Sequence, residues 1–137
     1  MAMAGSEAPS LIAYRDAMAL LQKGQFEAGA AALQSVLDSK LLPSYLLPDA
    51  HANLGTALSS LNRHEQAIRA LQTAVNANPG NSYHRYNLAL SFAETGNAEA
   101  AESQYRSCLQ IPTASAHNSA SCYNNLGNLL VTGGRRD

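Results

Sequence analysis

The chain carries the stretch Asn-Leu-Gly-Thr-Ala-Leu at residues 53–58, and two related stretches follow it. They read Asn-Leu-Ala-Leu-Ser-Phe at 87–92 and Asn-Leu-Gly-Asn-Leu-Leu at 125–130. The steps between their first asparagines are 34 and then 38. A period of this size indicates repeated supersecondary units, each of which buries its apolar face against the next.

A second, independent series of residues has the same spacing. It consists of turn-forming residues at steps of 38, 34 and 38: Gly24, Asn62, Gly96 and Gly134. Gly and Asn tolerate the left-handed backbone that ends a helix. Apolar residues at i, i+4, i+7 and i+8 on either side of these positions predict amphipathic helices. The predicted helices cover residues 10–23, 26–39, 48–61, 64–77, 82–95, 98–110 and 119–132.

Small residues also stay in phase with the repeat. They are Ala17, Gly55, Ala89 and Gly127 in the first helices, and Gly29, Ala67 and Ala101 in the second helices. Small side chains at fixed positions allow the backbones of neighbouring helices to approach closely. The sequence therefore predicts an all-α solenoid of stacked helix hairpins, with about seven helices.

The repeat resembles the tetratricopeptide repeat. Its best copy runs from His51 to Gly80, with Asn-Leu-Gly at 53–55, Glu-Gln-Ala-Ile at 65–68 and Asn-Pro at 78–79. The resemblance covers residues 10–137 and implies a right-handed superhelix whose first helices line the concave side. We expect repeats at about 10–47, 48–81 and 82–118, then a partial fourth at 119–137. Residues 1–9 are expected to be disordered or added for expression.

The copies depart from the family pattern in three ways. The first copy has Asp16 where the motif has Leu, and Gly29 where it has Ala, so we expect it to act as a cap. The first and third copies contain four extra residues near 40–47 and 111–118, about one helical turn each. Residues 131–137 supply only a turn and the start of a further helix. We therefore expect the chain to be a fragment of a longer protein, or its last helix to need a partner.

Composition excludes several classes of function. The 137 residues are 46% hydrophobic and 14% charged, with a net charge of −1. This balance lacks the basic patch that nucleic acid or an anionic membrane requires. The N-terminus has no secretory signal, and no apolar run reaches the roughly 20 residues of a membrane span. The expected location is cytoplasmic or nucleocytoplasmic.

No constellation of residues predicts chemistry. Cys108 and Cys122 lie fourteen positions apart without a CxxC motif, so we expect two buried, reduced thiols rather than a zinc site or a disulfide. No two of the four histidines share a helix at i and i+4, and we expect them on exposed polar surface: His51, His64, His84 and His117. There is no P-loop, GxGxxG or G-x-S-x-G motif. We predict no catalysis, no metal and no cofactor.

The predicted function therefore depends on a groove lined by the first helices. The candidate peptide-binding residues are Asn53, Thr56, Tyr83, Tyr86, Asn87, Leu90, Asn124, Asn125 and Asn128. Among them Asn53, Asn87 and Asn125 form an asparagine ladder, with one amide per repeat. A primary amide can both donate to and accept from an extended peptide backbone. This pattern is similar to that in the superhelical arm of O-linked N-acetylglucosamine transferases. The alternative is that each Asn supports helix stacking.

Three functions compete at this point. The first is a non-enzymatic module that binds an extended segment of another protein. The second is the substrate-recruiting arm of an enzyme, for example a glycosyltransferase, with its catalytic domain beyond Asp137. The third is self-association through an uncapped last helix, around Leu126, Leu129 and Leu130. A clamp for a terminal carboxylate is not expected, because its cationic places carry Tyr14, Met18, Tyr83 and Asn87.

Overall fold

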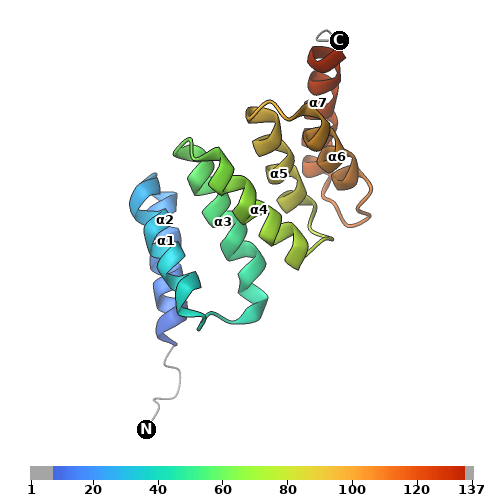
Figure 1. Cartoon of the computed structure of the whole chain (residues 1–137). Coiled ribbons are helices and arrows are strands. Elements are labelled where there is room, and N and C mark those ends of the chain that lie inside the picture. The colour runs from blue at the N-terminus through green and yellow to red at the C-terminus, as the bar shows by residue number, and fades with distance from the viewer. Residues whose placement is uncertain (1–7, 135–137) are drawn as a thin grey trace.

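The computed structural model describes residues 8–134, and within this range the chain forms seven α-helices and no strand (Figure 1). The helices are α1 (Pro9–Gln22), α2 (Phe26–Ser39), α3 (Leu47–Ser60), α4 (His64–Ala77), α5 (Ser82–Glu94), α6 (Ala98–Leu109) and α7 (Ala116–Gly134). We call α1, α3, α5 and α7 the A helices, and α2, α4 and α6 the B helices. The predicted all-α fold is confirmed. The predictions made for residues 1–7 and 135–137 lie outside the described residues.

Local sequence signals set the helix starts. Pro9 and Pro48 stand in the first turns of α1 and α3, where the missing N–H of proline costs nothing. The side chain of Asn81 accepts a hydrogen bond from the backbone N–H three residues later, at 2.9 Å, and so caps α5. Asn97 caps α6 in the same way, at 3.2 Å.

The predicted turn residues end three of the A helices. Gly24, Asn62 and Gly96 have φ angles of 78°, 61° and 84°, which is the left-handed region. Gly134 is the last residue of α7 and the last that the structure describes, so the turn predicted there is not tested. In the first three repeats the turn is followed by a B helix that packs back on its A helix.

The hairpins stack in one direction, from α1 to α7 (Figure 1). The A helices α3 and α5 each pack against the B helix of their own pair and against the B helix of the preceding pair, while α1 packs against α2 and α7 against α6. Ala17, Ala67 and Ala101 at the helix crossings are fully buried. A Cβ atom added to Gly55 would lie 2.6 Å from Cγ of Leu71. The predicted close approach is confirmed at these residues but not at Gly127, where an added Cβ would meet no described atom within 4 Å.

The core repeats with the chain. At one equivalent position in the three B helices the side chain is almost fully buried: Leu33, Leu71 and Tyr105. A leucine is buried at one position in three of the A helices: Leu54, Leu88 and Leu126. In α1 this position is the exposed Asp16. A charged side chain is tolerated there because it is exposed to solvent, and the role of the first copy as a cap stays a prediction.

The four extra residues take a different form at the two long steps. After α2 they form a left-handed residue at Lys40 (φ 59°) and the 3-10 helix η1 (Ser44–Leu46), which leads directly into α3. After α6 part of the insertion joins the next helix, so that α7 begins at Ala116 instead of 119. Its start is capped by Ser115, whose Oγ accepts from the N–H of Asn118 at 3.0 Å.

The prediction of two free thiols is wrong. The structure joins Cys108 and Cys122 as a disulfide between α6 and α7, with Cα atoms 6.8 Å apart. Both residues are fully buried, as expected. Two repeats earlier in the chain, Val36 and Ala50 occupy the same positions and are also buried. The cysteines thus replace an apolar contact between a B helix and the next A helix. The predicted reduced, cytoplasmic setting loses the support that free thiols gave it.

The prediction of exposed histidines is confirmed only for His117. His51 and His64 are half-buried, and His84 is 3% exposed. Its Nε2 lies 3.2 Å from Oδ1 of Asp49, in a geometry too poor for a full hydrogen bond. Burial lowers the pKa of His84 below its ordinary value of 6.5, and the nearby Asp49 only partly opposes this shift. His84 is buried because it occupies the repeat position of Ala50, which faces the preceding B helix.

Candidate functional site

The face formed by the A helices, here called the A-helix face, contains two pockets. The first pocket lies between α1 and α3 and has a volume of about 250 Å³. It is lined by Met18, Leu21, Gln22, Phe26, Asn53, Thr56, Ala57 and Ser60. The second pocket lies between α5 and α7 and has a volume of about 270 Å³. It is lined by Leu90, Ala93, Gly96, Ala98, Tyr105, Asn125, Asn128, Leu129 and Thr132.

Two asparagines of the ladder bind a tyrosine on the preceding A helix. The Nδ2 of Asn53 donates to the hydroxyl of Tyr14, and that of Asn125 donates to the hydroxyl of Tyr86, both at 3.2 Å. Burial raises the pKa of Tyr14, so this hydroxyl is neutral at ordinary pH. These amides connect successive repeats, and each still offers its carbonyl oxygen beside a pocket.

Asn87, the middle member of the ladder, has a different environment. It is only 8% exposed, and its Nδ2 has no hydrogen-bond partner. Ala52 stands at the repeat position that Tyr14 and Tyr86 occupy in the first and third repeats. The Asn87 amide therefore lacks the tyrosine hydroxyl that the amides of Asn53 and Asn125 contact. A role of the ladder in binding stays a prediction.

The other predicted site residues divide between the pockets and the surface beside them. Thr56 lines the first pocket, and its hydroxyl donates to the carbonyl of Asn53 at 3.0 Å. Leu90 and Asn128 line the second pocket. Tyr83 is 59% exposed, and its ring stacks on Tyr86 with centroids 6.5 Å apart. Asn124 is exposed and lies outside both pockets.

Sequence reasoning missed the apolar walls of both pockets. In the first they are Met18, Leu21 and Phe26, and in the second Ala98 and Leu129. These residues face the gap between A helices rather than the open groove, so a stripe along one helix does not reveal them. Aligning the first pocket's sequence with the sequence two repeats later, after one long and one short step, would have shown that the walls of the two pockets are equivalent.

One acidic side chain lies at the junction between α3 and α5. Glu94 is exposed at the end of α5, and its carboxylate accepts a hydrogen bond from Ser59 of α3 at 3.5 Å. In the wall of the second pocket, burial and the neighbouring Tyr86 raise the pKa of Tyr105 to about 12, while a contact with Asn125 opposes this. Tyr105 is therefore neutral, and Glu94 supplies the local charge.

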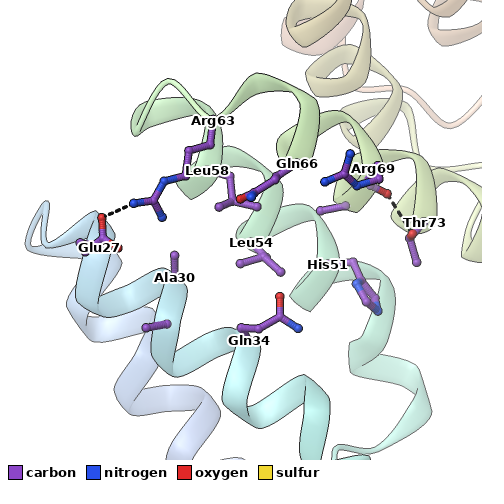
Figure 2. A pocket seen from close by; sticks show the side chains of 12 residues that line it. Glu27, Ala30, Gln34, His51, Leu54, Leu58, Arg63, Gln66, Arg69 and Thr73 are labelled. Atoms are coloured by element: carbon purple, nitrogen blue, oxygen red, sulfur yellow. Dashed lines mark hydrogen bonds and ion pairs between the residues drawn. The ribbon is translucent and has the colours of Figure 1, made fainter.

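A further hollow lies on the opposite side, between the B helices α2 and α4, with α3 as its floor (Figure 2). Its volume is about 460 Å³. An ion pair between Arg63 and Glu27, at 2.7 Å, crosses one end, and His51 and Arg69 lie toward the other. The candidate binding residues predicted from the sequence all lie on A helices, and none of them lines this hollow.

The uncovered side of α7 agrees only in part with the prediction. Leu126 is 6% exposed because it packs into the core beside α5 and α6, so it was wrongly assigned to an exposed patch. Leu129 is half-buried, whereas Leu130 and Val131 are 44% and 56% exposed. A Cβ atom added to Gly127 would meet no described atom within 4 Å.

Among residues 8–134, no group of three or more His, Cys, Asp or Glu side chains is placed to hold a metal ion. No helix among these residues is long and apolar enough to cross a membrane.

A family model described as the tetratricopeptide repeat matches residues 14–68 and 52–116. The Yersinia enterocolitica type III secretion chaperone SycD, solved with a peptide of the translocator YopD, has a TM-score of 0.81. It is 14% identical over 93% of this chain and 97% of that one. PcrH with the chaperone-binding region of PopD has a TM-score of 0.77 and 19% identity, over 97% and 98% of the two chains. The first TPR of Spaghetti (RPAP3), bound to the HSP90 peptide SRMEEVD, has a TM-score of 0.78 and 14% identity, over 91% and 93%. A comparison with curated proteins gives no match.

Proposed function

Because the chain belongs to the tetratricopeptide repeat family, we propose that it is a non-enzymatic module that binds an extended segment of another protein. The observation that carries this proposal is the pair of pockets on the A-helix face, each with apolar walls and an asparagine at its edge. Solved structures with this fold include chaperones and other proteins with bound peptides, which supports the same type of ligand.

The groups on the A-helix face suit a peptide with no free terminus in the site. The carbonyl oxygens of Asn53 and Asn125 and the exposed amide of Asn128 can pair with backbone N–H and C=O groups. A free terminal carboxylate needs opposing cations once it loses water. Tyr14 and Met18, at two places where such a clamp has cations, carry no charge. We therefore propose an internal segment as the ligand.

The test uses two variants at equivalent positions, because Thr56 and Asn128 line the first and second pockets. Peptides are selected from a displayed random library against the wild-type chain, and their affinities are measured by calorimetry. The double variant Thr56→Trp/Asn128→Trp should lose the selected peptides. Ser103→Trp, on the exposed surface of α6, is the matched control and should bind as the wild type does. Undiminished binding by the double variant would exclude the A-helix face as the site.

A second candidate function is self-association through α7. It is favoured by the open space at Gly127 beside the exposed Leu130 and Val131, since the equivalent Gly55 is filled by Leu71 of a B helix. Uncovered apolar patches of this kind drive association. Light scattering over a concentration series should show oligomers in the wild type and monomers in Leu130→Glu/Val131→Glu. A wild type that stays monomeric throughout would contradict this second function.

A further inference from the structure

The two pockets of the A-helix face are the same site, present twice. Asn53, Thr56 and Ser60 in the first pocket correspond to Asn125, Asn128 and Thr132 in the second, each two repeats later in the chain. Met18 on the opposite wall corresponds in the same way to Leu90. The Tyr–Asn hydrogen bond beside each pocket repeats as well, at 3.2 Å in both.

Both pockets occur where the repeat is long. The steps from α1 to α3 and from α5 to α7 are the long ones, and the step from α3 to α5 is shorter by four positions. At the short step the equivalent amide, that of Asn87, is buried, and Ser59 contacts Glu94 across the junction. The A-helix face therefore presents an apolar pocket, then an exposed carboxylate, then a second apolar pocket.

Each pocket has the size of one large side chain. An apolar cavity of about 150 Å³ is enough to hold a benzene ring, and the two volumes here are about 250 and 270 Å³. Each pocket has one large and one small apolar side chain at two equivalent wall positions, but the large one is at a different position in each. Phe26 and Ala57 in the first pocket are replaced by Ala98 and Leu129 in the second. One Leu, Met or Phe side chain of a ligand fits each.

The separation of the pockets sets the spacing of those side chains. The pockets are two repeats apart. Successive hairpins pack on each other through the B helix of one and the A helix of the next, and packed helices lie roughly 8–10 Å apart, so two repeats span roughly 16–20 Å. An extended chain advances about 3.3 Å per residue, and alternate side chains point to the same side. Two anchors on one side of an extended segment would therefore be about six residues apart.

We propose that the two pockets form one bivalent site for a single extended segment with two large apolar side chains about six residues apart and a basic side chain between them. The basic side chain would lie toward Glu94, whose carboxylate is exposed between the pockets. This proposal rests on the proposed binding of a peptide at the A-helix face. It adds that neither pocket is sufficient alone, because linking two weak sites raises the affinity about 100-fold or more.

The probe is the fluorescein-labelled peptide Leu-Ser-Lys-Ser-Lys-Ser-Leu, blocked at both ends, and its binding to the whole chain is followed by fluorescence polarisation. It should bind about 100-fold more tightly than either peptide in which one Leu is replaced by Ala. Peptides with the two Leu residues four or eight apart should bind at least tenfold more weakly. A peptide with Glu in place of both Lys should also bind more weakly, and Glu94→Lys should reverse this preference.

Matched variants assign the two anchors. Thr56→Trp and Asn128→Trp should each reduce the affinity for the two-Leu peptide to that for a one-Leu peptide, and Ser103→Trp should leave it unchanged. Circular dichroism establishes that each variant is folded. A pocket variant that leaves the two-Leu affinity intact would overturn the bivalent site.

The selected library peptides separate this proposal from the proposed function. If they bind the A-helix face but need only one apolar side chain, or if the two-Leu probe fails while they bind, the bivalent site is refuted and the binding function stands. If no peptide of any kind binds, or if the double pocket variant keeps them all, the proposed function itself fails.

Discussion

Two equivalent glycines, Gly55 in α3 and Gly127 in α7, should respond in opposite directions to the same substitution. In Gly55→Ala the new Cβ would lie 2.6 Å from Cγ of Leu71 and 3.2 Å from the carbonyl oxygen of Ala67. Leu71 is 1% exposed and cannot move away. Overpacking of this kind costs about 1–3 kcal/mol, and the better helix propensity of Ala returns up to about 1 kcal/mol. We expect a net loss of roughly 1–2 kcal/mol.

In Gly127→Ala the new Cβ meets no described atom within 4 Å, so only the helix-propensity gain of about 0.5–1 kcal/mol remains. The assay is urea unfolding followed by circular dichroism, at low protein concentration so that self-association does not cover α7. Since one variant is overpacked and the other gains only helix propensity, their free energies of unfolding should differ by about 2 kcal/mol. Equal changes, or a loss in Gly127→Ala, would refute the packing difference between the two sites.

Three further predictions concern buried polar groups and the disulfide. Tyr86→Phe should lower the free energy of unfolding in urea by about 1 kcal/mol, because it removes a hydrogen bond between repeats. Asn87→Leu should be neutral or stabilising, because the amide that it removes has no partner. A greater loss of stability in Asn87→Leu than in Tyr86→Phe would contradict this. Burial lowers the pKa of His84, so the histidine of the unfolded chain takes up a proton at a higher pH than that of the folded chain. The contribution of His84 to stability should therefore be fully present above about pH 6.5 and fall as the pH decreases. In urea unfolding this fall should be smaller in His84→Gln, and an equal fall would argue against a role of this histidine. The double variant Cys108→Val/Cys122→Ala has the residues found at the equivalent positions Val36 and Ala50. Its free energy of unfolding should be about 3 kcal/mol lower than that of the oxidised chain, and dithiothreitol should no longer affect its unfolding. Unfolding of the wild type that does not respond to the reductant would contradict the disulfide.

Part of the candidate site could be predicted from the sequence. The repeat placed Asn53, Thr56, Asn125 and Asn128 on the A helices, and the structure places all four at the pockets. The spacing could not show that the ladder is interrupted at Asn87. The environment of Asn87 depends on Ala52 of the preceding A helix, and the spacing of the asparagines contains no information about that residue.

The apolar walls were missed for a related reason. A pocket between two A helices takes its walls from the flanks of both, as with Leu21 and Ala57, and a periodicity search examines one helix at a time. The hollow between α2 and α4 has residues from three helices, so no single helical stripe encodes it either.

The sequence by itself determined the helices, their turns and their order of stacking, because helix propensity, caps and the periodic apolar residues all act over a few neighbouring positions. Small residues in phase also determined where the helices would touch. Only the tertiary structure decided which distant residues meet: Cys108 with Cys122, His84 with Asp49, and Tyr14 with Asn53. Such contacts depend on how the hairpins pack on each other: a pocket lies between the A helices at each of the two longer steps, and the buried amide of Asn87 lies at the shorter one.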